Sequence, residues 1–247
     1  MNEEKVDHFM LIENNQASKQ PLMTRLLLMC GVIGSFLFTI VYLIEGATRP
    51  GYNAWHQAIS LLSQSNQGWE QITNFIVCGL LIIAFAIGLR QTLRTGRGAT
   101  WGPILLAAVG VGLIVAGVFV TDPAQGYPPG TPDGSTVHPT LLGTIHFAIG
   151  APAVFGLLPL ACFVLARRFA EETQQKGWAV YSVLTGVLML AFFVGFIITG
   201  IHDGPAGLME RLSIMTGMAW IVLLATLLLR KTGGFRLERG NRSSQRP

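Results

Sequence analysis

The chain has 247 residues, of which 51% are hydrophobic and only 12% are charged, and its formal net charge at pH 7 is +4. A mean hydropathy of +0.50 excludes an ordinary soluble domain, and several uncharged runs are long enough to cross the ~30 Å hydrocarbon core of a bilayer as helices. The positive charge flanks these runs, where it reports membrane orientation, so it gives no indication of a nucleic-acid partner.

Six apolar runs organise the chain. We expect a polar cytoplasmic segment at 1–24, a single membrane domain at 25–230 and a basic cytoplasmic tail at 231–247. Because lipid offers the backbone no hydrogen-bond partners, each run is expected to be an α-helix. The expected spans are about 26–44, 72–89, 103–120, 141–166, 179–201 and 209–229. The sequence therefore predicts an all-α integral membrane protein, a six-transmembrane-helix bundle with both termini on one side.

The basic residues predict which side that is. Every lysine and arginine except Arg49 and Arg211 precedes the first run, follows the sixth, or lies in the second or fourth connection. The positive-inside rule assigns that side to the cytoplasm. We therefore expect a multi-pass protein of the plasma (inner) membrane with both termini in the cytoplasm.

The first external loop contains a candidate interfacial helix over 54–62. Helical spacing would place Trp55, Ile59 and Leu62 on one side and His56, Ser60 and Ser63 on the other. His56 and Ser60 would share a face, as a base and a nucleophile require. This spacing is also frequent by chance, so a purely structural interpretation stays open.

Small residues and prolines predict how the third and fourth runs pack. Ala108, Gly112 and Ala116 form a seam on the third run that permits close approach of a neighbouring helix. Pro152 and Pro159 are expected to kink the fourth run, because proline removes a backbone donor and clashes with the preceding turn.

The third and fourth runs are joined by the polar segment TDPAQGYPPGTPDGSTVHP, residues 121–139. Asp122 precedes Pro123, which disfavours helix at Asp122 and ends the third run. The prolines make the segment a stiff strap. We expect this strap to lie over the mouth of the bundle and to shield Asp122 and His146 from bulk water.

Ionisable residues recur at one depth, about twenty residues from the cytoplasmic end of each run at ~1.5 Å per residue. Arg211 is expected either to pair with a carboxylate of this layer, which Asp122, Asp203 or Glu210 could supply, or to extend to the lipid headgroups. The pattern predicts a polar pocket at the extracytoplasmic face, and ordinary polarity at a membrane boundary is the alternative. The layer contains Glu45, Glu70, Asp122, His146, His202 and Glu210, and the candidate ligand-binding residues are Asp122, His138, His146, His202, Asp203, Glu210 and Arg211.

Four blocks of the sequence resemble a known family. GYNAWHQAISLLSQSNQGWEQ, GVFVTDPAQGYPPGTP, HPTLLGTIHFAIG and GLMERLSIMTGMAW occur in the order typical of a prokaryotic membrane family, domain of unknown function 998. The resemblance covers about 26–230. It implies a six-helix membrane protein with external polar motifs, and no established activity. The positions that match the family pattern are His56, Ser60, Ser63, Asp122, Pro123, His138, His146, Glu210 and Arg211.

Three functions fit these features. The first is binding of a lipid headgroup or small amphiphile in the outer pocket. The second is a metal-assisted hydrolase acting on lipid, with His56, Ser60, Asp122 and His146 as catalytic candidates and His56, Asp122, His146 and His202 as candidate zinc ligands. The third is a permease-like protein, although the run centres carry few polar groups.

The expected partners follow from the membrane location. They are membrane lipids, and a membrane-protein partner or a second copy of the chain stays open. The set of Ser, Asp and His residues at one face is similar to that of ceramidase-like membrane hydrolases. Their His-x-x-x-His helix is missing here.

Overall fold

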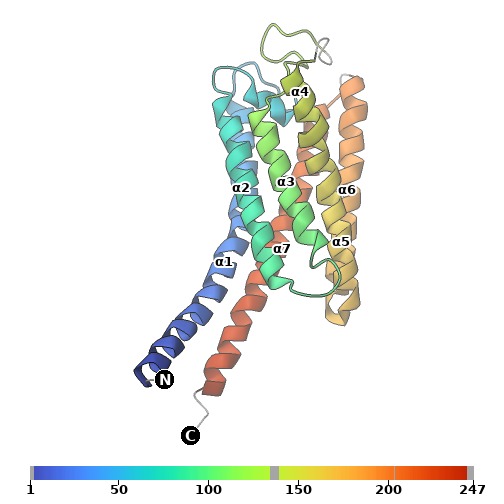
Figure 1. Cartoon of the computed structure of the whole chain (residues 1–247). Helices are drawn as coiled ribbons and strands as arrows, with labels where there is room; N and C mark the ends of the chain where they lie inside the picture. The colour runs from blue at the N-terminus through green and yellow to red at the C-terminus, as the bar shows by residue number, and fades with distance from the viewer. Residues whose placement is uncertain (1–2, 134–138, 203, 244–247) are drawn as a thin grey trace.

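The computed structural model describes residues 3–133, 139–202 and 204–243, and the described part is all-α (Figure 1). The long helices are followed or interrupted by short 3₁₀ or π turns. The helices are α1 (Glu3–Thr48), α2 (Trp69–Thr92), α3 (Trp101–Val118), α4 (Leu141–Ile145), α5 (Leu158–Glu171), α6 (Lys176–Ile201) and α7 (Ala206–Ser243), and the short turns are η1 (Ile59–Ser63), η2 (His146–Gly150), η3 (Ala153–Leu157) and η4 (Thr173–Gln175).

Six segments of the described chain are long and apolar enough to cross a membrane, as the hydropathy pattern predicts. Most extend a few residues beyond the predicted runs, because the helices continue into their polar ends. The third is displaced and ends at Val118, since Phe119 is already extended. The segments are Leu22–Thr48, Trp69–Thr92, Trp101–Val118, Leu141–Glu171, Thr173–Ile201 and Ala206–Lys231. The six-helix prediction is confirmed at this level.

The helices pack in chain order around the bundle, and α7 closes it by packing against α1. The start of α1 and the end of α7 consequently lie at the same end, here called the terminal end (Figure 1). The opposite end, called the distal end, carries the first loop, the strap and the α6–α7 turn. That the segments 1–24 and 231–247 lie outside the membrane domain stays a prediction; α1 already begins at Glu3 and α7 continues to Ser243.

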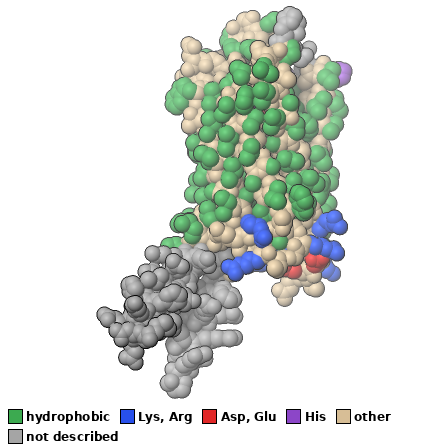
Figure 2. Space-filling model, viewed as in Figure 1, with side chains coloured by type: hydrophobic (Ala, Val, Ile, Leu, Met, Phe, Trp, Pro, Cys, Tyr) green, Lys and Arg blue, Asp and Glu red, His purple; other side chains and the backbone are tan. Residues whose placement is uncertain are grey.

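On the face seen in Figure 2, hydrophobic side chains cover the length of the bundle, and Lys and Arg gather near the terminal end. The most exposed span is α6, since only 17% of its apolar window is buried, against 33% to 56% for the others. Helix α6 packs mainly on α5 and α7. Most of its surface is therefore available to lipid.

Glycines set the closest helix contacts. A Cβ atom at Gly79 on α2 would lie 2.5 Å from the carbonyl oxygen of Gly110, and one at Gly110 on α3 would lie 2.6 Å from that of Gly79. On the other side of α3, a Cβ at Gly112 would lie 2.0 Å from the Cβ of Ala153 in η3. The seam predicted on the third run therefore faces the fourth span. The two segments approach closely because Gly112 has no side chain at their contact.

The fourth span is a composite of α4, η2, η3 and α5. Two π-helical turns, at His146–Gly150 and Ala153–Leu157, flank Ala151 and Pro152. Pro152 and Pro159 cannot donate backbone hydrogen bonds to the preceding turn, which favours wider local winding. The predicted proline irregularity is therefore present as two wide turns.

The loop between α1 and α2, here called the first loop, differs from the prediction. Instead of an amphipathic helix over 54–62, the chain makes turns at 53–57 and a five-residue 3₁₀ helix, η1, whose residues are all buried. The Tyr52 hydroxyl donates to the carbonyl oxygens of Gln57 at 3.0 Å and Ala58 at 2.9 Å, and the Ala58 carbonyl also accepts from the backbone N–H of Leu61 in η1. Ser60 and Ser63 are buried in η1, and the interfacial-helix prediction is wrong.

Candidate functional site

Arg211, on the second turn of α7, joins three parts of the distal end. Its Nη1 atom donates to the carbonyl oxygens of Gln57 at 3.0 Å and Gly207 at 2.9 Å, and its Nη2 atom donates to the Tyr52 hydroxyl at 2.6 Å. The guanidinium carbon lies 5.6 Å from the ring centroid of Tyr52 and 5.9 Å from that of Tyr42 on α1. These contacts satisfy the buried cation with carbonyl dipoles and aromatic faces.

The carboxylate partner expected for Arg211 is not found among the described residues. None of the ion pairs in the described part of the chain includes Arg211. The carboxylate of Asp122 accepts from Thr140, and that of Glu210 accepts from the backbone N–H of Ile59 at 2.6 Å. Asp203 lies outside the described residues. Glu210 therefore binds the first loop at η1, and Arg211 binds it separately at Tyr52 and Gln57.

Tyr52 is buried at the centre of this arrangement. Burial raises the pKa of its hydroxyl well above the usual value of 10.0, and the Arg211 guanidinium opposes the shift only in part. The neutral hydroxyl can accept from Arg211 while it donates to the carbonyls of Gln57 and Ala58. The raised pKa keeps this donor in place in the folded state.

The raised pKa of Tyr52 predicts that the protein loses stability at high pH. A folded-state pKa above the unfolded one stabilises the protein below the unfolded value of about 10, and the contribution is lost as pH rises beyond it. The unfolding temperature of Tyr52→Phe should therefore fall furthest below that of the unmodified protein near pH 8, and the gap should narrow by about pH 11. Thermal unfolding in detergent across this range measures the gap, and a constant gap would contradict the assignment.

A second charged group links α1 and α2. The Nη2 atom of Arg49 lies 3.1 Å from Glu45 Oε2 and 3.0 Å from Glu70 Oε2, and its Nη1 atom donates to the Ser65 hydroxyl. Arg49 was not among the predicted site residues. The i, i+4 spacing of Glu45 and Arg49 is the signal that could have found it.

Asp122 and His146 lie at the junction of α3 and the fourth span. The two Asp122 oxygens accept from the backbone N–H of Thr140 at 2.9 Å and from its hydroxyl at 2.6 Å. The His146 Nδ1 atom faces the carbonyl oxygens of Ala116 at 3.1 Å and Phe119 at 2.9 Å. Because carbonyls only accept, Nδ1 carries the proton. Both side chains are buried and close the end of α3 against the fourth span.

His56 and Ser60 are not arranged as a base and a nucleophile. Ser60 is buried in η1, whereas His56 is exposed and its Nδ1 atom lies 3.0 Å from the carbonyl oxygen of Gly204. This contact ties the first loop to the α6–α7 turn. The predicted catalytic pairing is therefore not present in the structure.

The predicted single pocket is divided into separate groups. His56, Asp122, His146 and His202 are all described, and no cluster of three or more His, Cys, Asp or Glu residues in the described chain could hold a metal ion. The proposed zinc set therefore does not form. His202 is exposed at the end of α6. His138, like Asp203, lies outside the described residues.

The strap packs on the first loop. The Tyr127 ring is buried and meets the Tyr52 ring edge-on, with centroids 5.3 Å apart. The Gln125 carbonyl accepts from Gln57 Nε2 and its side-chain oxygen accepts from the backbone N–H of Ala58, both at 2.9 Å. Gln64 also donates to the carbonyl oxygen of Thr121. The strap and the first loop thus form one cover over the distal end.

An open pocket of about 300 Å³ lies beside this cover. Three segments line it: the first loop, the strap, and the end of α6 with the following turn. Its polar lining comes from one carboxylate, one imidazole, one amide and one hydroxyl, and small residues leave the space open. The lining residues are His56, Gln125, Asp133, Thr199, Gly200, Gly204 and Ala206. Of these, only His56 was a predicted site candidate.

These features define a class of protein: a bundle of six helices of membrane-spanning length, closed at one end by two interlocked polar loops. The sequence matches the family described as "Protein of unknown function (DUF998)" over residues 32–227, so the chain belongs to this family. No curated protein and no solved structure matches the chain.

Proposed function

We propose that the protein binds the polar head of a membrane lipid or small amphiphile in the distal pocket. The observation that supports this proposal is the position of the pocket at the end of α6, the span with the most exposed apolar surface. Ile198 and Ile201 are 54% and 72% exposed beside the lining residues Thr199 and Gly200. An acyl chain lying along α6 would bring its head to the pocket.

The orientation belongs to the same proposal. The described lysines and arginines gather at the terminal end (Figure 2), apart from Arg49 and Arg211, which are buried at the distal end. By the positive-inside rule, the terminal end faces the cytoplasm and the pocket faces the opposite side. We place the protein in the plasma membrane of a prokaryote, as a multi-pass protein with both termini in the cytoplasm.

The chemistry of the lining favours a head with N–H donors. His56 Nδ1 donates to Gly204, which leaves Nε2 as an acceptor, and Asp133 supplies a carboxylate. No lysine or arginine lines the pocket in the described part of the chain. A primary ammonium head, such as that of phosphatidylethanolamine, can donate to both acceptors. A trimethylammonium head cannot.

The test compares lipids retained by the purified protein, counted by native mass spectrometry. We expect phosphatidylethanolamine to be retained over phosphatidylcholine, and Asp133→Asn to weaken its retention about tenfold, because a hydrogen bond to a charged group contributes roughly 1.5–3 kcal/mol. Glu171→Gln is the matched control, since Glu171 is an exposed acid at the terminal end. Equal retention of both lipids, or an equal loss in both variants, would refute the proposal.

A further inference from the structure

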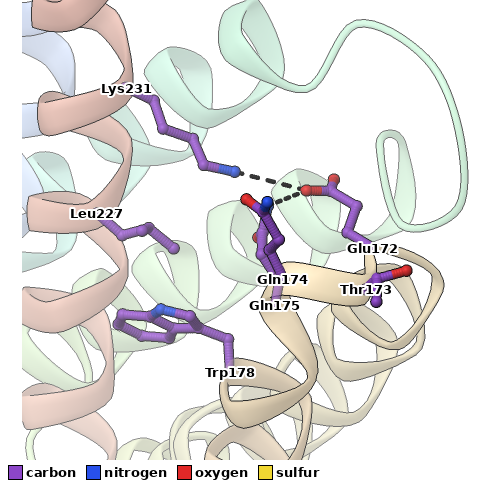
Figure 3. Close-up of a pocket in the computed structure, with 7 residues that line it drawn as sticks. All are labelled: Glu172, Thr173, Gln174, Gln175, Trp178, Leu227 and Lys231. Carbon is purple, nitrogen blue, oxygen red and sulfur yellow. Dashed lines mark hydrogen bonds and ion pairs between the residues drawn. The ribbon is translucent and has the colours of Figure 1, made fainter.

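A second pocket, of about 440 Å³, lies at the terminal end between η4, the first turn of α6 and α7 (Figure 3). Glu172 and Gln175 line it on the η4 side, and Leu227 and Lys231 line it on α7. Trp178 projects from α6 towards Leu227 (Figure 3). The pocket therefore has a polar part and an apolar part.

Gln175 has a buried acceptor atom with no partner among the described residues. Its Nε2 atom donates to Glu172 Oε2. A carboxylate only accepts, so the amide nitrogen must face Glu172 and the amide oxygen must point away from it. That oxygen is buried and accepts no hydrogen bond from the residues that the structure describes, and the residue as a whole is only 9% exposed. A buried unpaired acceptor next to a pocket is suited to a ligand that carries a hydroxyl or N–H donor.

Positive charge is available beside this acceptor. Lys231 Nζ lies 3.6 Å from Glu172 Oε2, and both side chains are nearly half exposed, so solvent weakens the pair. Among the described residues no side chain caps the start of α6 at Lys176, where the helix dipole adds positive potential. A Cβ atom at Gly177 would meet nothing within 4 Å, so this first turn is sterically open. An anionic group can approach Lys231 and the start of α6 together.

The apolar part of the pocket is formed by a tryptophan that packs against two other aromatic rings. The Trp178 ring packs against Phe169 on α5, with centroids 6.2 Å apart, and against Tyr181 at 5.8 Å. Leu227 on α7 faces it across the pocket. Tryptophan is favoured at membrane boundaries, where its ring contacts both acyl chains and polar heads.

We propose that this terminal pocket binds an anionic glycerophospholipid whose head carries a free hydroxyl group. The phosphate pairs with Lys231 near the start of α6, the head hydroxyl donates to Gln175 Oε1, and the first part of an acyl chain lies against Trp178 and Leu227. A soluble glycerol phosphate offers the same polar chemistry without the chain. The site is separate from the distal pocket and does not depend on the function proposed there.

The proposal is tested with the full-length protein by native mass spectrometry, with phosphatidylglycerol as the probe. Lys231→Gln is expected to weaken retention about tenfold, since a charge-assisted contact is lost. Glu172→Gln is expected to strengthen it, because the competing carboxylate is removed. Gln175→Leu should abolish the preference for phosphatidylglycerol over phosphatidylmethanol, which has the same charge but no free hydroxyl.

Arg94→Gln is the matched control, because it removes one exposed positive charge at the same end without touching the pocket. Equal losses in Arg94→Gln and Lys231→Gln would show general attraction to anionic lipid and would overturn the site. Retention that is unchanged in Lys231→Gln would overturn it as well. Binding of glycerol 3-phosphate as tight as that of the lipid would overturn the role of the acyl chain. The Lys231 and Glu172 variants keep the test decisive if Gln175→Leu fails to fold.

Discussion

Arg211→Leu is expected to lower the unfolding temperature of the protein by roughly 10 °C, because each buried hydrogen bond lost from a charged donor costs about 1.5–3 kcal/mol and each kcal/mol shifts the midpoint by about 2–4 °C in a chain of this size. The substitution removes the donor for the carbonyls of Gln57 and Gly207 and for the Tyr52 hydroxyl. Thermal unfolding of the purified protein in detergent measures the shift.

Arg167→Leu is the matched control, since Arg167 is exposed at the terminal end. It should change the unfolding temperature by only a few degrees, as exposed substitutions usually cost within about 0.5 kcal/mol. Arg211→Lys should fall between the two, because an ammonium cannot reproduce the planar fork that reaches Tyr52 and two carbonyls. Similar midpoints for Arg211→Leu and Arg167→Leu would show that the distal network contributes little to stability.

The second large effect is expected from Gly112→Ala. A Cβ at this position would lie 2.0 Å from the Cβ of Ala153, a distance that no side-chain rotation relieves. Helix α3 and η3 must move apart, and overpacking of this kind costs about 1–3 kcal/mol and occasionally more. The unfolding temperature should fall clearly, and the yield of folded protein should fall with it.

Two further variants make the Gly112 result specific. Gly156→Ala changes a glycine in η3 where a Cβ would meet nothing within 4 Å, so the unfolding temperature should stay within a few degrees of the original. The double variant Gly112→Ala with Ala153→Gly removes the clashing atom and should recover most of the loss. Failure of this rescue would mean that Ala153 is not the neighbour that limits residue 112.

The six spans were predictable because their signal is local. A run of about twenty apolar residues can satisfy its backbone in lipid only as a helix, whatever its neighbours are. The small-residue seam at Gly112 was also visible in the sequence, although its partner Ala153 was not. Boundaries were less accurate, because helices such as α7 continue through the polar residues that end a hydrophobic run.

The distal site was not predictable in detail, because backbone groups from distant segments are the main partners of its side chains. Arg211 donates to the carbonyl oxygen of Gln57, and His146 faces those of Ala116 and Phe119. Every residue type has a backbone carbonyl, so the sequence does not indicate which one a side chain will contact. Arg211 was expected to pair with a carboxylate, whereas in the structure backbone carbonyl oxygens accept its hydrogen bonds. The first loop likewise forms turns and the 3₁₀ helix η1 in place of the helix predicted over 54–62.

Because the fourth span contains two π turns, the number of residues in it, and not only their type, determines which side of α5 faces the bundle. Each π turn holds one residue more than an α turn, and one residue corresponds to a rotation of about 100° around the helix axis. Deleting one residue within either turn can be absorbed as that turn closes to an α turn, whereas inserting one more residue there would swing all of α5 to a different azimuth. This rotation would turn four buried side chains of α5 towards lipid: Leu158, Ala161, Cys162 and Leu165.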